Sequence, residues 1–162
     1  MKNPYAPYLG QQNSLEVLAA IPARLGALVE SLGKERTNRA PAPGKWSARE
    51  ILCHLADCEM AFGFRIRQIV AEERHIIQPF DQDKWAAMYA GYDAPAALEA
   101  FAAMRQWNLL FLGSLPAGAY GKTVSHPERG EGTLQTYLDM VAGHDLNHLG
   151  QIEAMRAAAA TG

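Results

Sequence analysis

The sequence predicts an all-α protein, a four-helix bundle that forms one domain over residues 1–162. No segment alternates apolar and polar residues as a half-buried strand does. Four segments of about 20 residues instead repeat apolar residues at the three- and four-residue spacing of an amphipathic helix. Two of the three connections between them are long, and bundles with such crossovers can bring neighbouring helices into parallel orientation.

The first predicted helix spans residues 14–32. Asn13 or Ser14 serves as its N-cap, and Gly33 ends it. Pro22 lies inside this helix and is expected to kink it, because proline lacks the N–H that the helix needs. The apolar face of this helix consists of Leu15, Leu18, Ile21, Leu25 and Leu28.

The second helix has the clearest start. Ser47 and Glu50 form a capping box, and Trp46 and Ile51 flank it at the positions of a hydrophobic staple. The helix is expected to continue to about Glu72.

The other two long helices follow from similar signals. The third begins near Pro95, a residue that suits a first helical turn, and ends at Gly113. The fourth covers residues 133–158. In the long connection before the third helix, residues 83–90 are expected to form a short helix closed by Gly91.

Composition and charge exclude several classes of protein. With 49% hydrophobic and 20% charged residues, the chain is typical of a globular domain. Its formal net charge of −2 comes from scattered charges, so it lacks the basic surface of a nucleic-acid binder. The first residues lack the apolar core of a signal peptide, and no apolar run reaches the about 18 residues of a membrane span. We therefore expect a cytoplasmic protein that binds neither nucleic acid nor membrane.

Two of the five histidines, His144 and His148, lie four residues apart in the fourth helix. Residues at this spacing are neighbours on a helix surface, and two imidazoles there can share a metal ion. The spacing alone arises by chance too often to carry this inference, and the helical projection of the surrounding residues adds to it. The projection places both imidazoles at the border of the apolar face and Asp145 in its middle, where a carboxylate needs a partner.

The second helix repeats this arrangement, because its apolar face includes Glu59 and carries His54 at one edge. A metal site requires neutral imidazoles together with carboxylates that accept the second ring N–H. We therefore predict a three-histidine metal site formed by His54, His144 and His148, with Asp145 and Glu59 behind the ligands.

The two acids also have a simpler interpretation. Glu59 can pair with an arginine such as Arg65 or Arg105, and Asp145 can do the same. Each histidine taken alone is more often a hydrogen-bonded core residue than a ligand.

The remaining histidines and the two cysteines are expected to have ordinary roles. Cys53 and Cys58 are too differently oriented on one helix to form a disulfide. Cys58 lies one turn after His54 and would be a soft metal ligand, but a small buried thiol is the expected role of both cysteines. His75 and His126 lie in connections, where an exposed loop histidine is expected, although either would also suit the mouth of an active site.

Three stretches give the sequence a likeness to a known family, the DinB-like superfamily of metal-binding four-helix bundles, which the chain resembles over almost its whole length. They are GKWSAREILCHLADCE at 44–59, Phe80-Asp81 with Trp85, and GHDLNHLGQI at 143–152.

The resemblance implies an up-down-down-up bundle, frequent homodimers, and a divalent metal bound by one histidine of the second helix and two of the fourth. Carried over to this sequence, these ligands are His54, His144 and His148. Characterised relatives include thiol transferases that use bacillithiol, mycothiol or glutathione, a maleylpyruvate isomerase, and the metal-binding part of a sulfoxide synthase.

The metal site suggests a function. Three protein ligands leave a coordination position open, which is typical of a catalytic site. Zinc is the expected metal, with nickel or iron as alternatives, because imidazole suits all three. The leading hypothesis is a metal-dependent thiol S-transferase or hydrolase that acts on a small molecule, with a low-molecular-weight thiol as a candidate cosubstrate. Two alternatives stay open: a non-catalytic metal- or ligand-binding bundle, and a structural bundle whose histidines are core residues.

Overall fold

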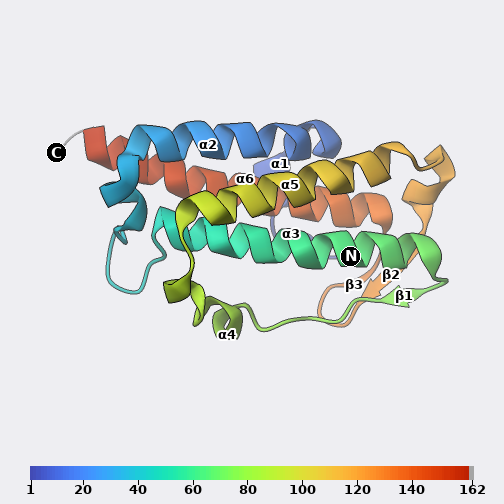
Figure 1. Cartoon of the computed structure of the whole chain (residues 1–162). Coiled ribbons are helices and arrows are strands. Elements are labelled where there is room, and N and C mark those ends of the chain that lie inside the picture. The colour runs from blue at the N-terminus through green and yellow to red at the C-terminus, as the bar shows by residue number, and fades with distance from the viewer. Residues whose placement is uncertain (161–162) are drawn as a thin grey trace.

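Four long helices make up the bundle: α2 (Ser14–Asn38), α3 (Ala48–Ala71), α5 (Ala94–Gly113) and α6 (Leu134–Ala160). The computed structural model describes residues 1–160, so Thr161 and Gly162, which end the predicted domain, lie outside the described residues. Figure 1 shows that α3 and α5 run in one direction and α2 and α6 in the other. This order confirms the predicted all-α, up-down-down-up bundle, and the parallel helices α3 and α5 are closely packed neighbours.

The two long connections both carry short elements. The first leads from α3 through strand β1 (His75–Ile76), helix α4 (Gln82–Ala86) and the 3₁₀ helix η1 (Tyr89–Gly91) back to the start of α5. Because α3 and α5 are parallel, this connection must return along the length of the bundle, as Figure 1 shows. The second leads from α5 through the 3₁₀ helix η2 (Ala117–Gly121) and strands β2 (Thr123–His126) and β3 (Gly130–Thr133) to α6.

The small sheet is a feature that the sequence does not predict. Strands β2 and β3 form an antiparallel hairpin, and β1 pairs with β2 in parallel. Strands this short cannot display an alternating pattern of apolar and polar residues. The sheet ties the two long connections together at one end of the bundle. The short helix α1 (Ala6–Leu9) near the N-terminus is likewise not predicted.

Helix starts follow the predicted caps. The side chain of Asn13 accepts hydrogen bonds from the first backbone N–H groups of α2, and Ser47 and Glu50 form the capping box of α3. The helical backbone of α2 is interrupted at Gly33 (φ 71°), where the sequence predicts its end, and it then resumes to Asn38. At Pro22, where a kink is predicted, the backbone angles stay helical.

The predicted short helix at 83–90 forms in two pieces. Its first part is α4, which Asp81 caps through hydrogen bonds from two backbone N–H groups, and its second part is η1, which ends at Gly91.

Apolar side chains of the four long helices form the core. The structure buries most of the residues on the faces predicted from the sequence, while Leu15 is only partly buried. Full burial of one such side chain contributes on the order of 1.5–3 kcal/mol. The buried residues include Leu18, Ile21, Leu25 and Leu28 of α2, Ile51, Leu55, Phe62, Ile66 and Ile69 of α3, Phe101 and Leu112 of α5, and Leu134, Leu138, Leu149 and Ile152 of α6. Within residues 1–160, none of the helices combines the length and the hydropathy that crossing a bilayer requires.

Gly143 brings the N-terminal segment against α6. A Cβ atom at this position would lie 2.5 Å from the backbone oxygen of Tyr5, closer than such atoms pack. The missing side chain therefore lets Tyr5 approach the helix beside His144, where the two rings meet edge to face with centroids 5.2 Å apart. A Cβ atom at Gly150 of the same helix would meet open space.

We expect the Gly143→Ala variant to be destabilised by about 1–3 kcal/mol, because the added methyl group must displace the backbone of the N-terminal segment. Gly150→Ala is the matched control and should be neutral or more stable by about 0.5–1 kcal/mol, because alanine favours a helix interior. Urea unfolding followed by circular dichroism measures both changes. Equal effects of the two substitutions would contradict the close approach at Gly143.

Candidate metal centre

Three histidines from two helices form one cluster, which consists of His54 of α3 and His144 and His148 of α6. Their ring centroids are 5.2 Å apart for His54 and His144, 4.9 Å for His54 and His148, and 4.5 Å for His144 and His148. The Nε2 atoms of His54 and His144 lie 3.1 Å apart. His54 and His148 are buried, and 14% of the His144 side chain is exposed. The structure thus brings together the three histidines that the sequence selects.

Two of these rings are oriented by partners on α6. Nδ1 of His144 lies 3.2 Å from Oδ1 of Asp145, and Nδ1 of His148 lies 2.9 Å from Oε1 of Gln151. Because both partners are oxygen acceptors, each Nδ1–H donates the hydrogen bond and each Nε2 keeps a free lone pair. The sequence analysis does not identify Gln151 as a partner of His148. The three-residue spacing between them, which makes the two side chains neighbours on the helix surface, is the pattern that could have indicated it.

Burial keeps the imidazoles of His54 and His148 neutral. It lowers the pKa of His54 from 6.5 to about 3 and that of His148 from 6.5 to about 4, because a buried cation is poorly solvated. The neighbouring His144 adds to both pKa shifts, since two imidazolium ions would repel each other. Neutral imidazoles with free Nε2 lone pairs are the form that binds a metal, so the cluster fits a divalent ion.

The thiol of Cys58 lies beside the cluster. Its Sγ is 3.5 Å from Nε2 and 3.8 Å from Nδ1 of His54. The donor atoms of His54, Cys58 and His144 all lie within 4.8 Å of one another. Burial raises the pKa of the Cys58 thiol. Both cysteines are free, as predicted; Cys53 is buried, and Cys58 is partly buried.

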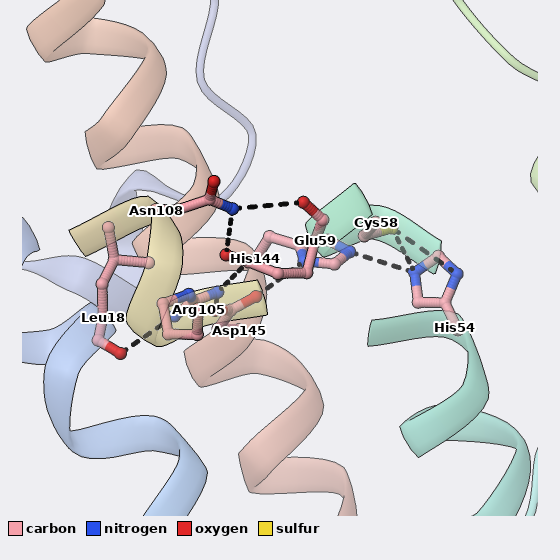
Figure 2. A network of polar contacts seen from close by, with 8 residues as sticks. All are labelled: Leu18, His54, Cys58, Glu59, Arg105, Asn108, His144 and Asp145. Carbon is pink, nitrogen blue, oxygen red and sulfur yellow. Dashed lines mark hydrogen bonds and ion pairs between the residues drawn. The ribbon is translucent and has the colours of Figure 1, made fainter. Parts of the chain in front are cut away.

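A buried arginine connects the cluster to the bundle core, as Figure 2 shows. Nη2 of Arg105 donates to Oε2 of Glu59 at 2.6 Å and to Oδ2 of Asp145 at 2.7 Å. Its Nη1 donates to the backbone oxygen of Leu18 at 2.9 Å. Of the two arginines considered from the sequence, Arg105 is therefore the partner of both acids. Arg65 instead donates to the backbone oxygen of Gln78.

The two acids differ in their second partners. Asp145 contacts both Arg105 and the His144 ring, as a carboxylate behind a metal ligand does. Glu59 also accepts a hydrogen bond from Asn108 at 2.8 Å, and within residues 1–160 no ring nitrogen of a histidine is recorded as its partner. Burial raises the pKa of Glu59 and would raise that of Asp145, but Arg105 and His144 hold the pKa of Asp145 below its usual value.

A cavity of about 180 Å³ opens on one side of the cluster. His54, Cys58 and His144 lie on its wall, whereas His148 lines a second cavity together with Trp46 and Gln151. The first cavity is lined by apolar and aromatic residues and by polar and charged residues from several elements. They include Tyr5, Phe62, Phe80, Tyr137 and Met140, together with Arg65, His126, Glu128 and Arg129.

The structure corrects the expectation of exposed loop histidines. His75 and His126 are both buried, at 7% exposure each, because they lie in the paired strands β1 and β2. Nδ1 of His75 lies 2.7 Å from Oε2 of Glu72, while His126 lines the cavity beside the cluster. Their burial depends on a sheet that the sequence does not reveal.

Aromatic rings cover the cluster. The indole of Trp46 lies 4.9 Å from the ring centroid of His54 and is stacked on His148 at 6.4 Å. The sequence predicts Trp46 only as part of a hydrophobic staple and gives no signal for Tyr5, which packs against His144. Both rings shield the cluster from water, and Trp46 thereby favours the neutral form of His54 and His148.

We expect the Arg105→Met variant to lose about 3–5 kcal/mol of stability, because it leaves Glu59 and Asp145 buried without a cation. Arg24→Met is the matched control. Arg24 pairs with Glu153 on the surface, where both side chains are nearly half exposed, so its loss should cost less than about 1 kcal/mol. Urea unfolding at neutral pH compares the two, and a small loss for Arg105→Met would contradict the buried charge network.

The lowered histidine pKa values predict that the metal-free protein loses stability as the pH falls. Below pH 6.5 the unfolded chain binds protons at His54 and His148, whereas the folded chain binds them only near pH 4 and pH 3. The loss should therefore begin below pH 6.5 and extend to about pH 3. Urea unfolding of chelator-treated protein at several pH values measures it.

The double variant His54→Gln/His148→Gln is the control for this pH dependence. The pKa of Glu59 is raised and that of Asp145 is lowered, so protonation of these two carboxylates changes the stability of the fold in opposite directions as the pH falls. Both contributions remain in the double variant. Its stability should vary less with pH in this range. A double variant with the wild-type slope would assign the effect to other groups.

Comparison with known proteins finds relatives that are named as metal-dependent hydrolases. A provisionally named metal-dependent hydrolase of Oceanobacillus iheyensis is 28% identical over 137 residues, which cover 83% of this chain and 79% of the relative. A protein of Bacillus mycoides with the same kind of name is 25% identical over 148 residues, which cover 88% of this chain and 83% of the relative.

A solved structure with the same fold is YfiT from Bacillus subtilis, described as a probable metal-dependent hydrolase with an unusual four-helix bundle topology. It has a TM-score of 0.84 and 23% identity, and the alignment covers 91% of this chain and 86% of YfiT. The family model of the DinB superfamily matches residues 18–152, which include all three histidines of the cluster. The chain therefore belongs to the DinB superfamily.

Proposed function

We propose that the protein is a metal-dependent hydrolase that acts on a small molecule, with a divalent ion held by His54, His144 and His148. The observation that carries the proposal is the convergence of three imidazoles, two of which donate from Nδ1 and so keep Nε2 for a metal. The names of the relatives from Oceanobacillus iheyensis and Bacillus mycoides support the same chemistry. Zinc is the first choice of metal, with nickel or iron as alternatives.

The surrounding residues have distinct roles in this proposal. When bound, the ion supplies Lewis acidity, which polarises a carbonyl or phosphoryl oxygen and acidifies water. Asp145 holds the proton of His144 at Nδ1, and Gln151 does the same for His148, so both rings keep their orientation. Arg105 keeps Asp145 ionised and therefore able to accept that hydrogen bond.

The cavity beside the cluster supports a small-molecule substrate. Its volume of about 180 Å³ suits a compact molecule, and its aromatic residues would exclude water from the reacting bond. Arg65 and Arg129 on its lining would favour a substrate that carries a negative charge.

Thiol S-transfer is the second candidate reaction. A metal site that acidifies water would also acidify a low-molecular-weight thiol, and Arg65 and Arg129 of the lining would suit the carboxylates of such a cosubstrate. A non-catalytic role remains the alternative to both reactions, in which the same site binds a metal or ligand without turnover. Consumption of an electrophile only when a thiol is added would favour the transferase.

We also propose that the protein works as a homodimer in the cytoplasm. Large apolar side chains stay exposed on the neighbouring helices α3 and α5, and such side chains often cover each other between two copies of a chain. They are Met60 and Phe64 of α3 and Trp107 and Leu110 of α5. Light scattering of the purified protein tests the dimer.

We expect protein purified without a histidine tag or chelator to contain about one metal ion per chain, bound with an open coordination position. His54→Ala, His144→Ala and His148→Ala should each lose most of the metal and the hydrolysis of small activated esters. His75→Gln is the control, because His75 is buried outside the cluster. Elemental analysis and ester hydrolysis measure both properties, and full metal content in the three alanine variants would overturn the proposed ligands.

A further inference from the structure

Cys58 faces the same space as two of the clustered histidines. It lies one helical turn after His54 in α3, and its Sγ is 3.5 Å from Nε2 of His54. That Nε2 atom is in turn 3.1 Å from Nε2 of His144. Figure 2 shows the Cys58 thiol and the His54 and His144 rings turned toward one another.

Two of the three separations between these donor atoms are close to the edges of a tetrahedral metal site, and all three are within 4.8 Å. Zinc binds imidazole nitrogen at about 2.0–2.1 Å and thiolate sulfur at about 2.3 Å. In a tetrahedron these bond lengths give about 3.3–3.4 Å between two nitrogens and about 3.6 Å between nitrogen and sulfur. The observed 3.1 Å and 3.5 Å are close to these values, so one ion can reach all three donors with small adjustments of the side chains.

His148 has a different relation to this group. The compact set of donor atoms within 4.8 Å consists of His54, Cys58 and His144. His148 approaches the other two rings from the side of the second cavity, whereas Cys58 lies on the wall of the first. Cys58 therefore occupies the side of the cluster from which a substrate in the first cavity would approach.

We propose that Cys58 is a thiolate ligand of the metal ion that His54 and His144 hold. The inference rests on the metal site of the proposed function and changes its coordination. On binding, the S–H bond is broken, the sulfur–metal bond forms, and the proton passes to solvent without any change of oxidation state. The thiolate then fills the position that faces the first cavity.

A thiolate in this position changes what the site can do. It favours soft or borderline ions such as Zn²⁺ and Co²⁺ over Mg²⁺ and Mn²⁺, which prefer oxygen ligands. It also means that a substrate must either join as an additional ligand or displace the sulfur. The chain holds a natural comparison, because Cys53 lies in the same helix but has no histidine as a recorded partner among the described residues.

Cobalt substitution tests the assignment. Metal-free protein is loaded with Co²⁺, and absorption spectra are recorded for wild type, Cys58→Ser and the matched control Cys53→Ser. A thiolate ligand gives a near-ultraviolet sulfur-to-cobalt charge-transfer band, while the visible bands report bound cobalt independently of sulfur. We expect the charge-transfer band in wild type and Cys53→Ser, its near-complete loss in Cys58→Ser, and metal binding at least about tenfold weaker in that variant.

A second measurement uses only the wild-type protein, so it does not depend on whether the Cys58→Ser variant folds. X-ray absorption of the zinc-loaded wild type should show one sulfur at about 2.3 Å besides nitrogens at about 2.0–2.1 Å. Visible bands without a charge-transfer band, or a zinc shell without sulfur, would overturn the assignment and leave the three-histidine hydrolase intact. A thiolate band in a protein without hydrolysis would support Cys58 and count against the hydrolase. No binding of cobalt or zinc would overturn both.

Discussion

The buried guanidinium of Arg105 is the interaction on which the arrangement of the bundle depends. It belongs to α5 and contacts Leu18 of α2, Glu59 of α3 and Asp145 of α6, so one side chain touches all four long helices. A buried charge group of this kind specifies one arrangement, because any shift of a helix would leave a charge without its partner. The register between α3 and α6 that this group sets is also the register that brings His54 to His144.

Asp145 links the buried charge group of the core to the histidine cluster. One of its oxygens accepts from Arg105, and the other accepts from the ring of His144. The orientation of that imidazole is therefore tied to the packing of the core, whereas His148 is oriented by Gln151 within its own helix. A disturbance of the core would reach the first ring more directly than the second.

The sequence predicts most of the bundle, because helical periodicity, the capping box and the positions of the histidines on two helices are all patterns of neighbouring residues. Arg105 has a signal as well, because it lies between Phe101 and Leu112 on the apolar face of α5, but periodicity does not choose between it and Arg65. The burial of His126 was out of reach, because it depends on the pairing of short strands from distant parts of the chain. The sequence places Cys58 one helical turn after His54, but a cysteine at such a position is most often a small buried thiol, which is the role that the sequence predicts.

The helices and the two long connections, which the sheet joins, contribute different parts of the site. Helices α3 and α6 carry the clustered histidines, whereas Phe80, His126 and Arg129 on the cavity lining come from the connections. Connections tolerate insertions and substitutions far better than packed helices do. Evolution can therefore reshape what enters the cavity without disturbing the reactive centre, so membership of the superfamily informs the type of centre more than the identity of the molecule that it transforms.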